Sequence, residues 1–347
     1  MKTDVLIVGG GISGCVLAWR WLLEGKSVCL VSDDKQSSSY VAAGVFNPVV
    51  LKRFTPVWNA TQQLDELAIF FESISSLTGI KLLHKTPILR RFHNESEIKT
   101  WKKKSLKTEL SALLNSDLYK SELAGIEATY GYGKVNRTGW VNTMNFIAAT
   151  VEHKSDRLKI QREKFDQSQL RIVKDAIYYK ELMADRIIYA EGMRMNDNEF
   201  FKHIRLIPNK GQVLIIKSPG LVVDHIIKSS VFLMPYKEDL FWVGATYERE
   251  FDSPDPTSEG MEFLTSRLNQ FLKVPYTVVS HLSGVRPTTM DRRPLVGTHN
   301  QFDNVHLFNG MGSRSVLIAP WASRKLYDHI YMDLDLPVEM NISRFDA

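Results

Sequence analysis

The sequence predicts an α/β protein in which a domain built on a parallel sheet is joined to a second domain whose sheet is mixed and largely antiparallel. Two observations lead to this prediction. Apolar, β-branched runs alternate with helical patterns towards both ends of the chain, as in βαβ units. Between them, residues 158–190 and 211–248 hold short strand-like runs separated by turns, which favours antiparallel pairing. The 347 residues suffice for two domains that share the chain discontinuously.

The first predicted element is a βαβ unit. Residues 4–8 are apolar and rich in β-branched side chains, residues 12–24 carry apolar side chains at helical spacing, and residues 27–31 form a second apolar run. Since parallel strands need a crossover between them, this order predicts the start of a parallel sheet. The same reasoning predicts helices over 61–78, 97–115, 141–153, 257–272 and 315–331, and a buried strand over 305–310.

The turn between the first strand and the first helix carries the pattern G-x-G-x-x-G, from Gly9 to Gly14. The first glycine permits the tight turn, the second lets the backbone approach a pyrophosphate, and the third lets the helix pack closely on the strand. The N–H groups at the start of the helix attract phosphate. This Rossmann-like arrangement predicts that a dinucleotide is bound by Gly9, Gly11, Ile12, Ser13 and Gly14.

The end of the second strand usually supplies an acid that binds the ribose of the adenosine. Ser32 stands at that position, and Asp33 and Asp34 follow it. Each of the three is a candidate ribose ligand. The alternative, in which the aspartates only cap a solvated turn, stays open.

Composition narrows the class of protein. With 44% hydrophobic and 24% charged residues, and no run of about 18 apolar residues, the chain is predicted to be globular without a membrane span. A net charge of +5 is compatible with an anionic ligand and too small to require nucleic acid. Cys15 and Cys29 are predicted to be reduced core thiols, which favours a cytoplasmic protein over a disulfide framework.

Four further segments have recognisable patterns. Residues 37–44 are a serine-rich turn leading to A-A-G, residues 184–192 read ADRIIYAEG, residues 284–297 hold G-x-R-P followed by D-x-x-P-x-x-G, and residues 310–320 form a glycine-containing loop before A-P. Their order resembles that of the D-amino-acid oxidase and glycine oxidase superfamily of flavoproteins. The tripeptide from Gly312 to Arg314 also resembles the flavin domain of the bifunctional enzyme that modifies the tRNA wobble uridine.

The resemblance implies FAD as the cofactor. The flavin is expected to be non-covalent, because no cysteine follows Cys29 and Val41 stands where some relatives have a linking histidine. No metal site is predicted. The expected FAD-binding domain comprises residues 1–80, 137–205 and 284–347, and the expected substrate domain residues 81–136 and 206–283. The further predicted cofactor residues are Ala42, Ala43, Gly44, Phe165, Ala190, Gly192, Gly310, Met311, Gly312, Ser313, Arg314 and Ser315.

The resemblance also implies a reaction, the oxidation of a small amine or amino acid with transfer of electrons to oxygen or another acceptor. Arg286, in G-x-R-P, is the predicted anchor for a substrate carboxylate, because a guanidinium matches a carboxylate bidentately. Its alternative role is structural, paired with a carboxylate such as that of Asp291. Tyr236 and Tyr247 are candidate substrate residues or packing residues, and Trp242 is predicted to line the core or the pocket.

Two other functions remain open. An RNA-modifying flavoenzyme could remove a carboxymethyl group from a nucleoside amine by the same chemistry, and the basic run after Trp101 is its candidate RNA surface. The other interpretation of that run, a solvated helix face, is preferred because it lacks interleaved aromatic residues. The second alternative is a flavin-binding protein without catalysis, in which Arg286 is structural.

Overall fold

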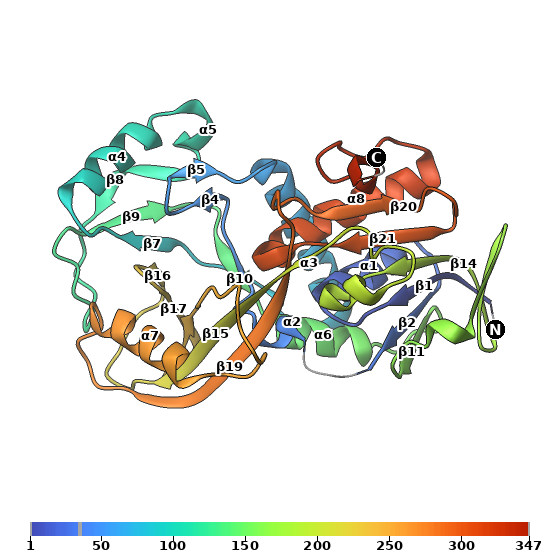
Figure 1. Cartoon of the computed structure of the whole chain (residues 1–347). Coiled ribbons are helices and arrows are strands. Elements are labelled where there is room, and N and C mark those ends of the chain that lie inside the picture. The colour runs from blue at the N-terminus through green and yellow to red at the C-terminus, as the bar shows by residue number, and fades with distance from the viewer. Residues whose placement is uncertain (1, 34–36, 346–347) are drawn as a thin grey trace.

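Two eight-stranded sheets lie side by side in the computed structural model, which describes residues 2–33 and 37–345 (Figure 1). The first sheet has the order β11-β2-β1-β14-β13-β12, and β14 also pairs with β21, which pairs with β20. Neighbouring strands are parallel from β11 through β2, β1 and β14 to β21. The strands of this sheet are β1 (Lys2–Val8), β2 (Val28–Ser32), β11 (Leu158–Arg162), β12 (Leu170–Val173), β13 (Ala176–Tyr179), β14 (Leu182–Tyr189), β20 (Leu295–Thr298) and β21 (Val305–Asn309).

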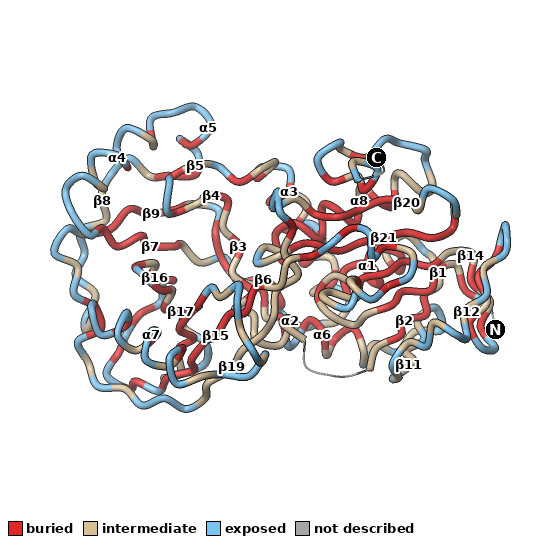
Figure 2. Tube along the Cα trace, in the orientation of Figure 1, coloured by how far each residue is buried: buried red, intermediate tan, exposed pale blue. Residues whose placement is uncertain are grey.

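Four helices pack beside this sheet: α1 (Ile12–Leu23), α3 (Ala60–Thr78), α6 (Thr143–Val151) and α8 (Ser315–Met332). The helix α1 contacts β1 and β2 as well as α6 and α8, so its residues are buried on nearly all sides (Figure 2). Even Arg20 is buried, and its charge is compensated by an ion pair with Glu66 on α3. Burying this much apolar surface holds the start of α1, which carries the glycine turn, rigidly against the sheet.

The second sheet has the order β19-β15-β18-β17-β16-β7-β9-β8. Its neighbours are antiparallel except for β7 and β16, which are parallel. The helix α7 (Ser258–Asn269) packs on β15 and β18. The strands are β7 (Ile88–Arg91), β8 (Leu114–Tyr119), β9 (Tyr132–Val135), β15 (Ile207–Lys217), β16 (Ile226–Lys228), β17 (Phe232–Lys237), β18 (Leu240–Gly244) and β19 (Thr277–Thr288). The predicted α/β class, with a parallel sheet and a mixed, largely antiparallel one, is therefore confirmed.

Shorter elements connect the two sheets. A three-stranded sheet has the order β3-β10-β6, and β4 pairs with β5. These elements are α2 (Ser38–Val41), β3 (Val45–Phe46), β4 (Val49–Val50), β5 (Thr55–Pro56), β6 (Leu83–Lys85) and β10 (Gly139–Val141), together with the 3-10 turns η1 (Gln167–Gln169), η2 (Gly192–Asp197), η3 (Gly312–Arg314) and η4 (Ile342–Phe345).

The long strands β15 and β19 bring the two sheets together (Figure 1). They pair from Ile207 with Thr288 to Lys217 with Thr277. The strand β19 also contacts α2, η2 and η3, which lie beside the first sheet. The second sheet takes its strands from residues 88–135 and 207–288, so the predicted boundary at residue 284 falls inside β19. The division into domains otherwise stays a prediction.

The predicted helix over residues 97–115 is wrong in part. The structure has α4 (Glu95–Ser105) and α5 (Thr108–Ser111), separated where Lys107 is extended, and Leu114 already belongs to β8. The chain leaves the helix because Leu114 pairs with Val135 on β9. Trp101 is fully buried and donates to the carbonyl of Asn115 at 2.8 Å, so it is a core residue and offers no surface on which a nucleic acid base could stack.

Both cysteines are free and buried, as predicted. Burial raises the pKa of Cys15 to about 12 and that of Cys29 to about 11, so both are protonated at neutral pH. In the described part of the chain, no helix combines the length and apolar character needed to cross a bilayer. The cytoplasmic location stays a prediction.

Candidate active site

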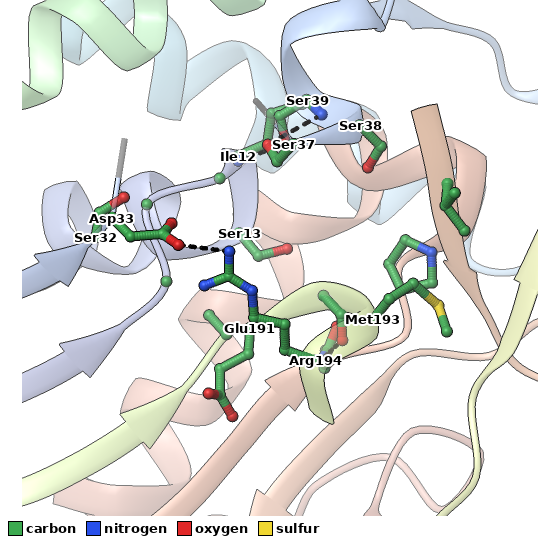
Figure 3. Close-up of a pocket in the computed structure, with 18 of the residues that line it drawn as sticks. Ile12, Ser13, Ser32, Asp33, Ser37, Ser38, Ser39, Glu191, Met193 and Arg194 are labelled. Atoms are coloured by element: carbon green, nitrogen blue, oxygen red, sulfur yellow. Dashed lines mark hydrogen bonds and ion pairs between the residues drawn. The ribbon is translucent and has the colours of Figure 1, made fainter. Parts of the chain in front are cut away.

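A first cleft of about 350 Å³ opens at the carboxyl ends of β1, β2 and β14 (Figure 3). Cofactor sites occur at such strand ends in parallel sheets. Twelve of the predicted cofactor residues line this cleft: Gly9, Gly11, Ile12, Ser13, Ser32, Asp33, Phe165, Ala190, Gly192, Met311, Gly312 and Ser315. The structure therefore brings together residues from both ends and the middle of the chain.

The glycines of the turn have separate structural roles. Gly9 has a φ of 111°, and a Cβ at this position would overlap the carbonyl group of Ala190. A Cβ at Gly14 would overlap the carbonyl oxygen of Gly9, so Gly14 allows the helix to pack on the turn without itself lining the cleft. Gly11 differs, because its nearest neighbour would be the Ser39 hydroxyl at 3.0 Å and its position faces the cleft.

The start of α1 is suited to an anion. Gly11 is the N-cap and has no side chain that could accept from the first-turn N–H groups. Ser39 reaches across from α2, and its hydroxyl accepts from the N–H of Ile12 at 3.1 Å (Figure 3). The N-terminus of a helix carries a partial positive charge, so this end of the cleft fits a pyrophosphate.

An ion pair lies at the end of β2, where the sequence predicts the ribose ligand. Asp33, at the end of β2, pairs with Arg194 of η2 at 2.6 Å, and both residues line the first cleft (Figure 3). Ser32 lies against Gly10, at which a Cβ would overlap the Ser32 side chain. Asp34 lies outside the described residues. The binding of the ribose by Ser32, Asp33 or Asp34 remains a prediction.

A second cleft of about 380 Å³ adjoins the first and lies between the two sheets. Ile12, Ser38, Ser39, Gly284, Gly312 and Ser315 line both clefts. The predicted site residues along the second cleft are Ala42, Ala43, Gly44, Ser313, Arg314, Arg286 and Tyr247. Gly310 lines neither cleft. Its φ is 70°, and it packs against Leu295 and Thr289.

Arg286 lies on β19 with its guanidinium held by neutral acceptors. Nη1 donates to Oδ1 of Asn209 at 2.8 Å and to the carbonyl of Thr246 at 3.3 Å, and Nη2 donates to the same carbonyl at 3.4 Å. A Cβ at Gly211 would overlap the guanidinium, so the glycine leaves the room that Arg286 occupies. Burial lowers the pKa of Arg286, and the charges of Tyr247 and Glu248 oppose this effect.

Arg286 forms no ion pair within the described residues, and Glu248, whose charge acts on it, pairs with Lys210 at 3.9 Å. Asp291, the partner considered in the structural alternative, pairs with Arg344 at 3.2 Å. An arginine that is anchored by neutral groups and faces a cleft is available to an anionic ligand.

The two candidate tyrosines lie in different places. Tyr247 lines the second cleft, and its ring centre is 5.9 Å from the guanidinium carbon of Arg286. Tyr236 lines a separate hollow of about 50 Å³ on the far side of Val41, Ala42 and Trp242. The structure therefore brings Tyr247 to Arg286 and does not bring Tyr236 there.

Several residues around Arg286 were not predicted from the sequence. Asn209, Gly211 and Thr246 belong to no motif and are remote from Arg286 along the chain. The detectable signal is cross-strand register, since Asn209 stands opposite Arg286 and Gly211 opposite Gly284. Trp242 was predicted to line the core or the pocket, and it lines the second cleft while its ring N–H donates to the carbonyl of Val41 at 3.2 Å.

Lys228 also lines the second cleft, and its titration gives a stability prediction. Burial and, to a smaller extent, the nearby Arg90 lower the pKa of Lys228 to about 8. Because this pKa is depressed in the folded state, the contribution of Lys228 to stability is complete above its ordinary pKa of 10.5 and declines as the pH falls through about 8. We expect Lys228→Met to raise the free energy of unfolding more at pH 7 than at pH 10 in urea titrations. An equal effect at both pH values would contradict this prediction.

The fold and the site are those of a dinucleotide-dependent enzyme. The first cleft lies at a Rossmann-like glycine turn, and it adjoins a second cleft that the guanidinium of Arg286 lines. The comparison with known families agrees. Residues 4–328 match the model of the FAD dependent oxidoreductase family, and the chain belongs to that family.

Individual relatives resemble the chain over nearly its whole length. A glycine oxidase from Pseudomonas aeruginosa is 23% identical, with 94% of each chain covered. The crystal structure of glycine oxidase from Geobacillus kaustophilus superposes with a TM-score of 0.81 at 17% identity, covering 99% of this chain and 98% of the other. A tRNA 5-methylaminomethyl-2-thiouridine biosynthesis bifunctional protein from Idiomarina loihiensis is 23% identical, but this chain covers only 54% of its length. The chain is thus an FAD-dependent oxidoreductase, as the sequence predicted.

Proposed function

We propose that this protein oxidises the C–N bond of a small amino acid or secondary amine whose carboxylate is held by Arg286. The observation that carries the proposal is the guanidinium of Arg286, which faces the second cleft with Asn209 and Thr246 as neutral acceptors. The name of the Pseudomonas aeruginosa relative supports a small amino acid as substrate.

The cofactor is assigned to the two joined clefts. The pyrophosphate is placed at the turn from Gly9 to Ser13, and the flavin ring beside Ala42, Ala43 and residues 312–315, because the start of α1 suits an anion and the second cleft begins at these segments. The chemistry that FAD would supply when bound there is that of a hydride acceptor for the carbon that bears the amine.

The residues of the chain bind and orient the substrate. A carboxylate on Arg286 fixes the position of the neighbouring carbon, and Trp242 and Phe232 line the cleft with apolar surface. As hydride leaves the carbon, the nitrogen lone pair forms the imine and the nitrogen releases a proton. Water then hydrolyses the imine, and the electrons pass to oxygen or another acceptor. Tyr247 contacts the substrate in this proposal, whereas Tyr236 stays a prediction.

Anaerobic reduction of the flavin tests the proposal. The purified protein is mixed without oxygen with glycine, sarcosine, proline and D-amino acids, and the flavin absorbance is followed. We expect at least one of these amines to bleach the flavin. If none does, and Arg286→Ala leaves the affinity for every carboxylate unchanged, the chain is a flavin-binding protein in which Arg286 is structural.

The neutral partner of Arg286 gives a second prediction. Asn209 is 1% exposed, and Asn209→Asp places a carboxylate where its amide oxygen accepts from Arg286. An internal ion pair then competes with the substrate, so we expect carboxylate affinity to fall by about tenfold, or about 1.4 kcal/mol. This loss is measured by titrating the flavin absorbance with methoxyacetate, an unreactive carboxylic acid that binds without being oxidised. Asn145→Asp, which adds the same charge at an exposed position, should leave the affinity unchanged. Equal affinities in the two variants would contradict the prediction.

The RNA-modifying alternative has no support from the site. The basic run from Lys102 to Lys107 lines neither cleft, and Trp101 beside it is buried. Retention of the protein on immobilised tRNA that falls steeply with salt would favour this alternative.

A further inference from the structure

The two clefts differ in the charged side chains that line them. The first cleft contains acidic and basic side chains together, namely Asp33, Glu163, Lys164, Glu191 and Arg194. The described residues that line the second cleft include four cations and neither aspartate nor glutamate. The cations are Lys52, Lys228, Arg286 and Arg314, which come from four separate segments of the chain.

Arg314 is a second guanidinium without a counterion. It ends η3 and is the N-cap of α8. Within the described chain, its guanidinium makes no hydrogen bond or ion pair, in contrast to that of Arg286. Burial lowers the pKa of Arg314, and the charges of Arg292 and Arg293 lower it further. A partly buried cation beside two other cations is destabilising unless an anion joins it.

The two lysines extend the positive region along the cleft. Lys228 lies at the end of β16, where its ammonium donates to the carbonyl of Ser230 at 3.0 Å and lies 4.7 Å from the ring centre of Phe232. Lys52 is exposed in the turn after β4. Lys228 is thus partly covered by apolar surface, whereas Lys52 is accessible to solvent at the edge of the cleft.

A substrate with one carboxylate compensates only part of this charge. The carboxylate neutralises Arg286 and leaves the other three cations without a counterion. The pyrophosphate of FAD does not supply the missing charge, because its proposed site at the start of α1 is in the first cleft, which none of these four cations lines. The second cleft therefore has positive charge for a further anionic group.

We propose that the substrate is an amine that carries two anionic groups, one bound by Arg286 and the other by Arg314 with the two lysines. This inference rests on the proposed amine oxidation and narrows its substrate class to dianionic amines, such as secondary amines with a carboxylate on each side. The reaction is unchanged: the carbon next to the nitrogen loses a hydride, the nitrogen loses a proton, and water hydrolyses the imine.

A matched pair of unreactive acids tests the inference. Diglycolate and methoxyacetate both carry a carboxylate one methylene group away from an ether oxygen, and only diglycolate has a second carboxylate. Binding to the holoenzyme is measured from the change in flavin absorbance. We expect diglycolate to bind at least about tenfold more tightly than methoxyacetate at neutral pH.

Two variants test whether the preference for diglycolate over methoxyacetate arises in the second cleft. Arg314→Met, compared with the wild type at equal FAD content, should remove most of the preference for diglycolate over methoxyacetate. Lys103→Met, which removes an exposed charge on α4, should preserve the preference. Equal affinities for the two acids in the wild-type protein would overturn the inference, and so would an Arg314→Met variant that weakens both acids equally, because Arg314 would then serve the flavin or the common carboxylate.

Reduction by amines separates this inference from the proposed function. Anaerobic sarcosine and iminodiacetate differ by one carboxylate, and we expect the rate of flavin reduction at limiting substrate to be at least about tenfold higher with iminodiacetate. If sarcosine reduces the flavin and iminodiacetate is no better, the inference fails and the proposed function stands. If no amine reduces the flavin, the proposed function itself fails.

Discussion

Replacing Arg286 by methionine is expected to weaken methoxyacetate binding by at least about 100-fold while FAD stays bound. The guanidinium is anchored by Asn209 and Thr246 and faces the second cleft, so the variant removes a charge-assisted, bidentate interaction from a partly buried site. Losing one partner of such a pair costs about 2–5 kcal/mol, and each 1.4 kcal/mol is tenfold in affinity. Flavin difference spectra measure the affinity, and the absorbance ratio of protein to flavin measures FAD content.

Two further variants separate charge from geometry at this position. Arg286→Lys keeps the charge but loses the planar fork, so its affinity should lie between those of the wild type and Arg286→Met. Arg249→Met removes an exposed cation close in sequence to Tyr247 and should change nothing. If Arg286→Met binds methoxyacetate as tightly as the wild type, the carboxylate is bound elsewhere and the assignment of the second cleft is wrong.

A side chain at Gly11 is expected to prevent FAD binding without unfolding the protein. Gly11 has φ −75° and ψ −174°, which any residue can adopt, and the atoms nearest to the place that a Cβ would take belong to the side chains of Ser39 and Ser37. The side chain of Gly11→Val would instead occupy the first cleft where the pyrophosphate is placed. We expect FAD affinity to fall by at least about 100-fold, which corresponds to about 3 kcal/mol. Quenching of FAD fluorescence measures this affinity.

The controls for this prediction are two other glycines. Gly220→Ala has only Val274 near its Cβ, at 4.0 Å, and should affect neither FAD binding nor stability. Gly14→Ala should lower the Tm even without FAD, because its Cβ would overlap the carbonyl oxygen of Gly9. If apo Gly11→Val has the wild-type Tm and still binds FAD normally, the pyrophosphate does not lie at this turn.

The part of the site that the sequence indicated is the part whose motif residues lie close together in the chain. The glycine turn and the segment from Ala42 to Gly44 are recognised by short spacing, although Gly9 packs against Ala190 and Gly44 against Val141 in the fold. The fold class followed from apolar runs, because β1 and β14 each end in a continuous buried apolar stretch, residues 5–8 and 187–189.

The surroundings of Arg286 depend on contacts that are distant in sequence. Asn209 is 77 residues from Arg286 and Thr246 is 40 residues from it, so only the pairing of β15 with β19 and β18 brings them together. Tyr236 and Tyr247 could not be distinguished for the same reason, since each lies beyond or near a strand end and only tertiary structure decides which cleft it lines. The helix predicted over residues 97–115 failed because pairing of Leu114 with Val135 outweighed local helical preference.

A crystal structure of the FAD-bound protein with diglycolate tests the central claim most directly. The account predicts pyrophosphate oxygens at the N–H groups that follow Gly11, one carboxylate in contact with the guanidinium of Arg286 and the second within reach of Arg314. A dinucleotide outside the first cleft, or an acid whose carboxylates contact neither arginine, would contradict it.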